Sequence, residues 1–141
     1  MKVKAILIIA LSNFFLAANV TYASSPSPAG ATVYIISPTD GEVLESPVTV
    51  VFGLQGMGVA PAGTDRPDTG HHHLLIDLEE PPATDRPLPA DAQHIHFGGG
   101  QTETTIDLPP GEHTLQLILG DMSHFPHSPP VMSEKITIVV K

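Results

Sequence analysis

Cysteine and tryptophan are absent from the 141-residue sequence, and only six residues are lysine or arginine. The lack of cysteine excludes disulfide bonds, thiolate metal sites and a cysteine nucleophile. Fifteen acidic residues give a formal net charge of −9 at pH 7, which argues against nucleic acid as a partner because phosphate binding needs a basic surface. Hydrophobic residues make up 41% of the chain and charged residues 15%, so the sequence can bury the core of one domain.

Residues 1–23 have the features of a signal peptide. Lys2 and Lys4 form a positive start, residues 5–18 are almost entirely apolar, and the small residue Ala23 fits the end of a cleavage site. The apolar stretch is too short and too interrupted to span a membrane. We therefore predict cleavage after Ala23 and export to a bacterial periplasm or full secretion. No cysteine near this position could carry a lipid, so we expect no membrane attachment after cleavage.

The remaining sequence has the pattern of a short leader followed by β-strands. Residues 24–32 are rich in serine, proline and alanine and predict a flexible leader, while residues 33–141 are expected to form the folded domain. Hydrophobic residues in this domain recur with period two between turn sequences, which indicates strands. The predicted strands cover residues 33–37, 47–54, 71–78, 93–97, 101–108, 112–120 and 131–140. This pattern predicts an all-β, immunoglobulin-like antiparallel β-sandwich of about seven strands, and a cupredoxin-like or other Greek-key sandwich would fit nearly as well.

The predicted strand order gathers most of the histidines at one end of the sandwich. Connections in antiparallel sandwiches usually reverse the chain direction. If each one does so here, seven of the eight histidines lie at one end, and His113 lies at the other. In the third predicted strand the alternation places His72 on the apolar face and His71 and His73 on the opposite face.

The spacing of these histidines indicates a metal site. Two histidines at positions i and i+2 of a strand share a face and lie about 6.6 Å apart along the chain, so both imidazoles can bind one ion at about 2.0–2.1 Å per bond. Two His-x-His pairs have this spacing, and a His-x-x-His pair follows an aspartate that could ligate a metal or orient a ligand. Imidazole and carboxylate ligands suit Zn²⁺ or Cu²⁺, and the thioether groups of the methionines could also serve as ligands for Cu⁺. The predicted ligands are His71, His73, His94, His96, Asp121, His124 and His127.

Several of these residues also have structural interpretations. His72 and His113 are in phase with apolar residues of their strands, so we expect both to be buried and hydrogen-bonded. The His-x-His pairs could form cross-strand hydrogen bonds on a polar sheet face, and the loop histidines could serve only to hold their loop. The sequence has no nucleophile elbow and no His-Glu-x-x-His motif, so we expect no enzymatic activity.

Four motifs give the chain a family resemblance. They are GHHHLLID at 70–77, HIHFGGGQTE at 94–103, LPPGEHTL at 108–115, and the region from Gly120-Asp121 to Ser133-Glu134. Together they resemble the bacterial family catalogued as domain of unknown function 4399, over residues 33–140. The resemblance implies an exported bacterial domain. It supplies no activity, because the family is named for lacking one.

We interpret the sequence as an exported transition-metal-binding protein that holds copper or zinc in a histidine cluster at one end of a β-sandwich. Binding should depend on pH, since each imidazole must lose a proton, with an ordinary pKa of about 6.5, before it ligates. The alternative is a structural or protein-interaction module whose histidine-rich end contacts a periplasmic protein without metal; a pH sensor is a third interpretation. A metal site predicts converging imidazole nitrogens, whereas an interaction module predicts splayed side chains and an exposed apolar patch.

Overall fold

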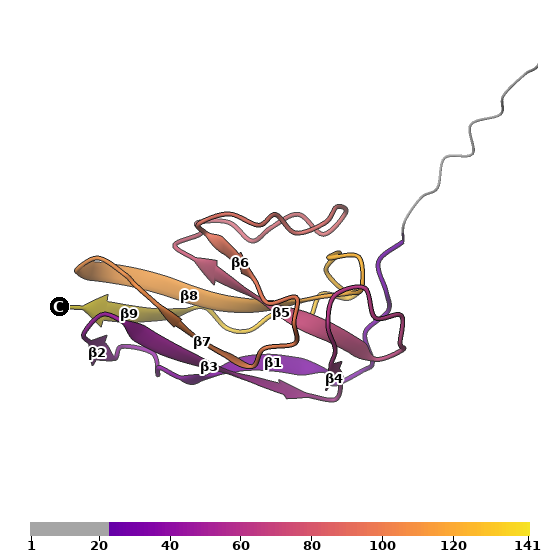
Figure 1. Cartoon of the computed structure of the whole chain (residues 1–141), viewed down its shortest axis with the longest axis horizontal. Helices are drawn as coiled ribbons and strands as arrows, with labels where there is room; N and C mark the ends of the chain where they lie inside the picture. The colour runs from indigo at the N-terminus through magenta and orange to yellow at the C-terminus, as the bar shows by residue number, and fades with distance from the viewer. Residues whose placement is uncertain (1–22) are drawn as a thin grey trace, which may run out of the picture.

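The fold is described from a computed structural model over residues 23–141. The predicted signal peptide lies outside the described residues except for Ala23. The secondary structure of this part of the chain consists of strands, and it includes no helix long and apolar enough to cross a bilayer. Figure 1 shows an elongated domain with the C-terminus at one end and the N-terminal segment entering at the other.

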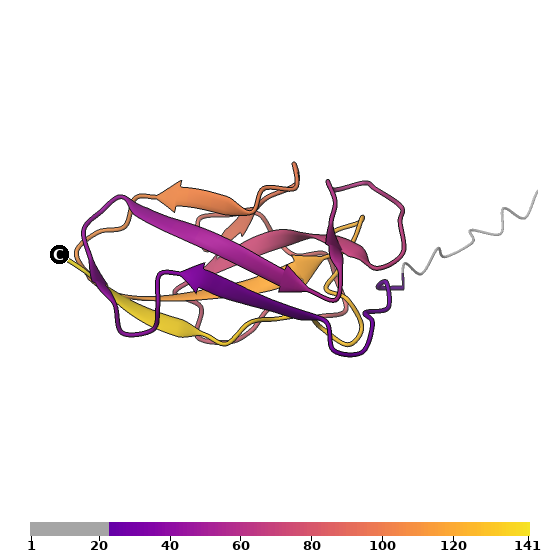
Figure 2. The same ribbon diagram turned by 90° about the horizontal axis from the view of Figure 1, so that it is seen from below.

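Nine strands of the described chain form two sheets that face each other (Figures 1 and 2). One sheet has the order β1-β3-β7, and the other has the order β2-β9-β8-β5-β4, with β6 paired to β5. Placing β1, β3 and β7 opposite β5, β8 and β9 corresponds to strands A, B and E opposite C, F and G of immunoglobulin domains. The prediction of an all-β, immunoglobulin-like sandwich is therefore confirmed. The strands are Thr32–Ser37 (β1), Val43–Leu44 (β2), Val48–Gln55 (β3), Gly58–Val59 (β4), Thr69–Ile76 (β5), His94–His96 (β6), Glu103–Ile106 (β7), Gly111–Gly120 (β8) and Ile136–Val140 (β9).

All seven predicted strands are present with shifted ends, and the two-residue strands β2 and β4 are additional. Those two pair in parallel with β9 and β5, and they are too short to show an alternating pattern. The strand predicted at 71–78 ends early because Asp77 adopts a left-handed φ of 53° and its carboxylate accepts a backbone N–H of β8. The last strand begins only at Ile136, because the preceding residues, including Ser133, contact β8 irregularly.

The main core lies between the two sheets. Val33, Val50 and Phe52 contribute from the three-stranded sheet, and Leu74 and Leu117 contribute from the larger one. Complete burial of such a side chain stabilises the fold by about 1.5–3 kcal/mol. The period-two pattern of the sequence therefore determines which faces of β3, β5 and β8 point inward.

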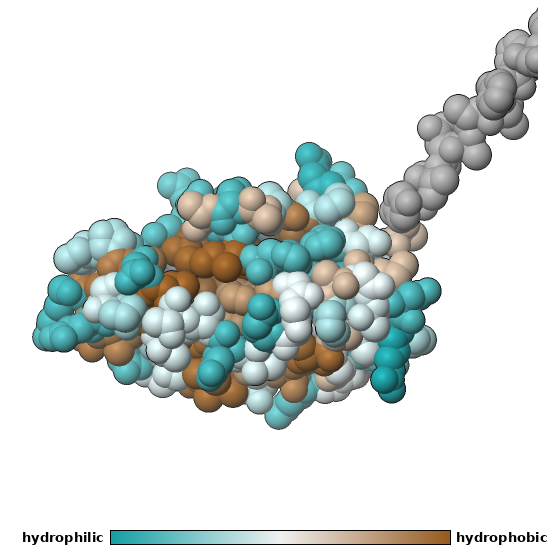
Figure 3. Space-filling model, in the orientation of Figure 1, coloured by the Kyte–Doolittle hydropathy of each residue, from teal (hydrophilic) through white to brown (hydrophobic). Residues whose placement is uncertain are grey.

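The opposite face of β5 is also buried. Residues 79–92, which we call the covering segment, lie over it, and Leu88 of this segment packs on Leu75 and Ile118 in a second, smaller core. In Figure 3 hydrophobic residues are visible between the covering segment and β8 below it. The second face of β5, including its histidines, therefore belongs to the interior and is not a polar outer face.

The N-terminal segment is attached to the domain before β1 begins. Residues 25–28, within the predicted leader, run along the loop at 121–129. The Ser27 N–H donates to the Ser128 carbonyl at 3.1 Å, and the Ser128 N–H donates to the Ser25 carbonyl at 2.9 Å. These bonds give the segment a defined place at the end of the sandwich where the histidines lie.

Candidate metal centre

Four histidine rings pack against one another at one end of β5. His71 and His73 share a face of β5 because they are two positions apart. The pairing of β5 with β6 places His96 opposite His73, and the loop at 121–127 contributes His124. Their ring centroids lie 4.7–6.2 Å apart. The predicted histidine cluster is therefore present, and it is assembled from two strands and one loop.

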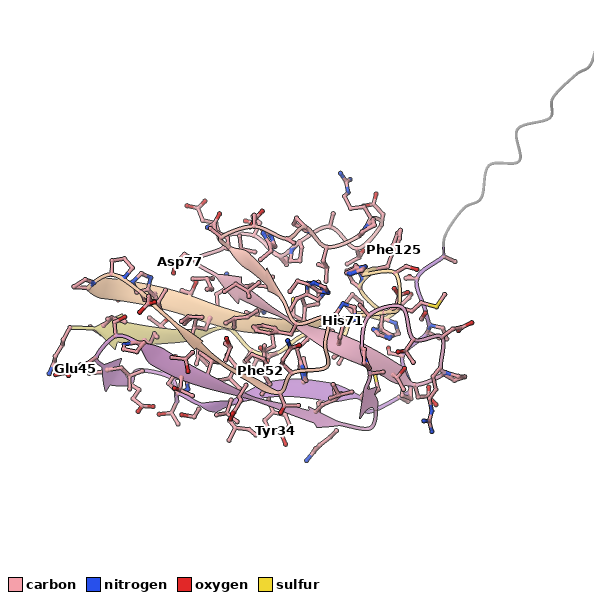
Figure 4. All side chains as sticks on the ribbon, in the orientation of Figure 1. Tyr34, Glu45, Phe52, His71, Asp77 and Phe125 are labelled. Carbon is pink, nitrogen blue, oxygen red and sulfur yellow. The ribbon has the colours of Figure 1, made fainter. Side chains whose placement is uncertain are left out.

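Three of the rings bring nitrogens close enough to share one ion. His71, His73 and His96 each offer one ligand atom, and these atoms lie within 4.8 Å of one another. The Nε2 atoms of His71 and His73 are 3.0 Å apart, while two nitrogens bound to one tetrahedral ion at about 2.0–2.1 Å would be about 3.3 Å apart. Figure 4 shows His71 and Phe125 in the half of the molecule away from Glu45. This group could hold a metal ion.

Burial keeps the group neutral. His71 and His73 are both 0% exposed. Burial, together with the neighbouring rings of His96 and His124, lowers the pKa of His71 to about 4. Burial and the surrounding histidines lower the pKa of His73 to about 3, and the pKa of His96 is lowered by burial and by His124. A neutral imidazole offers the lone pair that a metal needs.

Three buried nitrogens of this group have no hydrogen-bond partner within residues 23–141. They are Nδ1 of His71, Nδ1 of His73 and Nε2 of His96. Buried polar atoms are nearly always paired, because an unpaired one loses its bonds to water without replacement. These unpaired imidazole nitrogens could therefore accept a ligand that residues 23–141 do not supply.

Asp121 shapes the loop that carries His124. Its Oδ1 accepts the backbone N–H groups of Ser123 and Phe125 at 2.9 and 3.0 Å, and its Oδ2 accepts the N–H and the hydroxyl of Ser25, each at 3.0 Å. Burial alone would raise the pKa of Asp121, but these hydrogen bonds outweigh it and lower the pKa. Both oxygens are thus engaged, which fits the orienting role considered for Asp121 better than the ligating role.

Two glycines leave the space that the rings occupy. A Cβ at Gly120 of β8 would lie 2.9 Å from His73 Nε2 and 3.4 Å from His71 Nε2, and a Cβ at Gly98 would overlap the His96 ring. A larger residue at either position would have to displace an imidazole. These glycines were not among the predicted site residues, although their position beside the histidine motifs is a signal that the sequence offers.

The structure places the other predicted ligands outside the three-histidine group. His94 Nδ1 lies 2.8 Å from the Asp91 carboxylate. The two ring nitrogens of His127 face the carbonyl oxygens of Leu119 and Thr69 at 3.3 and 3.2 Å. Both ring nitrogens of His127 thus contact backbone oxygens, and His127 lies outside the three-histidine group.

The two histidines expected to be structural are buried and hydrogen-bonded, as predicted. His72 packs in the core against Phe52, with ring centroids 5.1 Å apart, and its Nδ1 lies 3.2 Å from the Gln101 carbonyl. His113 lies 2.8 Å from the Asp77 carboxylate through Nδ1 and 2.8 Å from a backbone carbonyl through Nε2. Burial opposes the charging of His113, but these hydrogen bonds outweigh it and raise its pKa.

A comparison with known families gives one match. The family model described as Domain of unknown function (DUF4399) matches residues 50–141, a region that contains all four clustered histidines. No curated protein and no solved structure matches the chain significantly. The comparisons therefore assign no ligand or activity, and the chemistry of the site has to supply them.

Proposed function

The chain belongs to the DUF4399 family, a domain of unknown function, and we propose that it is an exported protein that binds a transition metal ion, copper or zinc, through its histidine cluster. The convergence of His71, His73 and His96 carries this proposal, because their ligand atoms lie within 4.8 Å of one another. His124 packs against all three rings and is the proposed fourth ligand.

The ligand set favours a divalent ion. Imidazole nitrogens suit Zn²⁺ and Cu²⁺, and for a given set of nitrogen ligands Cu²⁺ binds more tightly than Zn²⁺. The formal net charge of −9 adds a general attraction for cations. We therefore expect both ions to bind, with copper the tighter of the two.

The geometry supports metal binding over the metal-free interaction module. Such a module would present splayed histidines around an exposed apolar patch. Instead, the histidine rings contact one another, and His71 and His73 are withdrawn from solvent. A buried pair of this kind does not form the exposed contact surface that a metal-free interaction module needs.

We propose that the protein acts outside the cytoplasm and that it binds metal without catalysing a reaction. The signal-peptide features of residues 1–23 support action in the periplasm, or outside the cell after full secretion. The catalytic motifs absent from the sequence support binding over catalysis. In this role the protein would hold a metal ion and exchange it with a periplasmic partner protein.

The test is to titrate metal-free protein comprising residues 24–141 with Cu²⁺ and, separately, with Zn²⁺, and to measure binding by isothermal titration calorimetry. We expect one ion per chain and a Kd below about 1 µM. His71→Ala or His96→Ala should weaken binding by at least about 100-fold, since each removes one of the four proposed ligands.

The matched control is His94→Ala, which removes the other histidine of the His94–His96 pair. Because His94 is hydrogen-bonded to Asp91, this variant should keep the wild-type affinity within about threefold. Wild-type protein that shows only weak surface adsorption of both ions would contradict the proposed function.

A further inference from the structure

The N-terminal segment reaches the metal centre through Ser25. We infer that Ser25 is a positioning residue for the metal ligand His124, although it lies almost 100 positions earlier in the chain. This inference rests on the proposed function and extends it, because it makes the segment ahead of β1 part of the metal centre.

Three successive contacts connect Ser25 to the His124 ring, and the first link is the carboxylate of Asp121. Ser25 supplies both hydrogen bonds to Oδ2, from its N–H and its hydroxyl, each at 3.0 Å. Oδ1 is left to accept the N–H groups of Ser123 and Phe125, on either side of His124. Ser25 therefore fixes the orientation in which the carboxylate can hold the loop.

The second link is the backbone of His124. Its φ is 69°, a left-handed conformation that is uncommon for any residue other than glycine and persists only where the surroundings hold it. The His124 N–H donates to the Asp121 carbonyl at 2.9 Å, and its carbonyl accepts the Leu88 N–H at 2.8 Å. The loop and the covering segment thus hold His124 from two sides.

The third link is the imidazole of His124. Its ring centroid lies 4.7 Å from that of His96 and 5.1 Å from that of His71. A small rotation of the loop would move this ring away from both. The predicted cleavage after Ala23 would leave Ser25 in the mature chain, where its contacts with Asp121 could persist.

The test compares Ser25→Ala, which removes one donor to Asp121, with Ser25→Pro, which removes both. Ser27→Ala is the matched control, because the Ser27 hydroxyl donates to the Pro129 carbonyl at 2.7 Å and not to Asp121. We expect Zn²⁺ affinity to fall about fivefold in Ser25→Ala and further in Ser25→Pro, and to stay unchanged in Ser27→Ala. With His124→Ala already present, neither Ser25 substitution should weaken binding further.

A second readout does not need metal. In the metal-free protein, Ser25→Ala should shift the NMR signals of the His124 imidazole and leave those of His113, at the other end of the domain, unchanged. Unaltered Zn²⁺ affinity and unaltered His124 signals in Ser25→Ala would overturn the inference, as would a loss of affinity that simply adds to that of His124→Ala. Failure of the wild-type protein to bind Zn²⁺ or Cu²⁺ would instead contradict the proposed function, while the NMR comparison would still test the positioning of His124.

Discussion

The protonation of single residues should determine how the proposed metal centre responds to acid. An exposed histidine has a pKa of about 6.5 and is mostly charged at pH 5.5. Burial and the neighbouring histidines bring the pKa of His71 to about 4 and that of His73 to about 3, so both stay neutral at pH 5.5. The pH dependence expected from ordinary histidine pKa values is therefore moved to lower pH.

This shift predicts a pH profile for metal binding. Protons compete with the metal only below the pKa of each ligand, so Zn²⁺ affinity should fall by less than about tenfold between pH 7.5 and pH 5.5 and drop steeply below about pH 4. Competition titrations across this range are the measurement. A peptide with three exposed histidines is the reference, and it should lose about tenfold per imidazole by pH 5.5. A domain that loses affinity as the peptide does would show that its histidines titrate normally.

At the scale of secondary-structure elements, the site depends on how closely β5 and β8 approach. The two strands pair so that His71 lies opposite Gly120, and the missing side chain of Gly120 leaves room for the two Nε2 atoms of β5. The covering segment closes the same face through Leu88. The placement of the proposed ligands is thus set by one strand pairing and one long loop.

Gly120→Ala tests this arrangement. The added Cβ would lie 2.9 Å from His73 Nε2, so we expect Zn²⁺ affinity to fall at least about 30-fold and the free energy of unfolding of the metal-free protein to fall by about 1–3 kcal/mol. Gly58→Ala is the control in a neighbouring strand, because its Cβ would lie at ordinary contact distances, 3.5 Å from Thr69 and 3.9 Å from the Asp68 carbonyl oxygen. Calorimetry and urea denaturation measure the two effects. Wild-type affinity in Gly120→Ala would show that the ion does not occupy this space.

At the scale of the whole molecule, the proposed metal centre joins segments that are far apart in the sequence. His71, His96 and His124 come from β5, β6 and the loop after β8, and Asp121 connects that loop to Ser25. Unfolding separates all of these residues. A metal ion that needs them together therefore binds the folded state and stabilises the entire domain.

The expected stabilisation can be measured by thermal unfolding. With free Zn²⁺ at about 100 times its Kd, the gain is about 2.7 kcal/mol, which corresponds to a rise in Tm of about 10 °C for a domain of this size. His96→Ala should show little or no rise at the same Zn²⁺ concentration. An equal rise in both proteins would mean that Zn²⁺ stabilises the fold from another site.

Much of the fold was predictable because burial alternates along a strand. The period-two pattern located all seven longer strands and placed His72 and His113 in buried positions. It could not foresee that the face of β5 carrying His71 and His73 would be covered, because the covering segment has no regular period and packs there mainly through Leu88.

The sequence by itself determined the strands, the acidic charge, the absence of thiolate ligands and the supply of paired histidines, because these follow from composition and local spacing. Only the tertiary structure decided which histidines meet. His94 and His96 form one His-x-His pair, so the sequence makes both equally good candidate ligands. Strand pairing nevertheless sets His96 opposite His73, while His94 is hydrogen-bonded to Asp91. Spacing along a chain limits which residues can share a face, but pairing register and loop closure decide which nitrogens converge on one point.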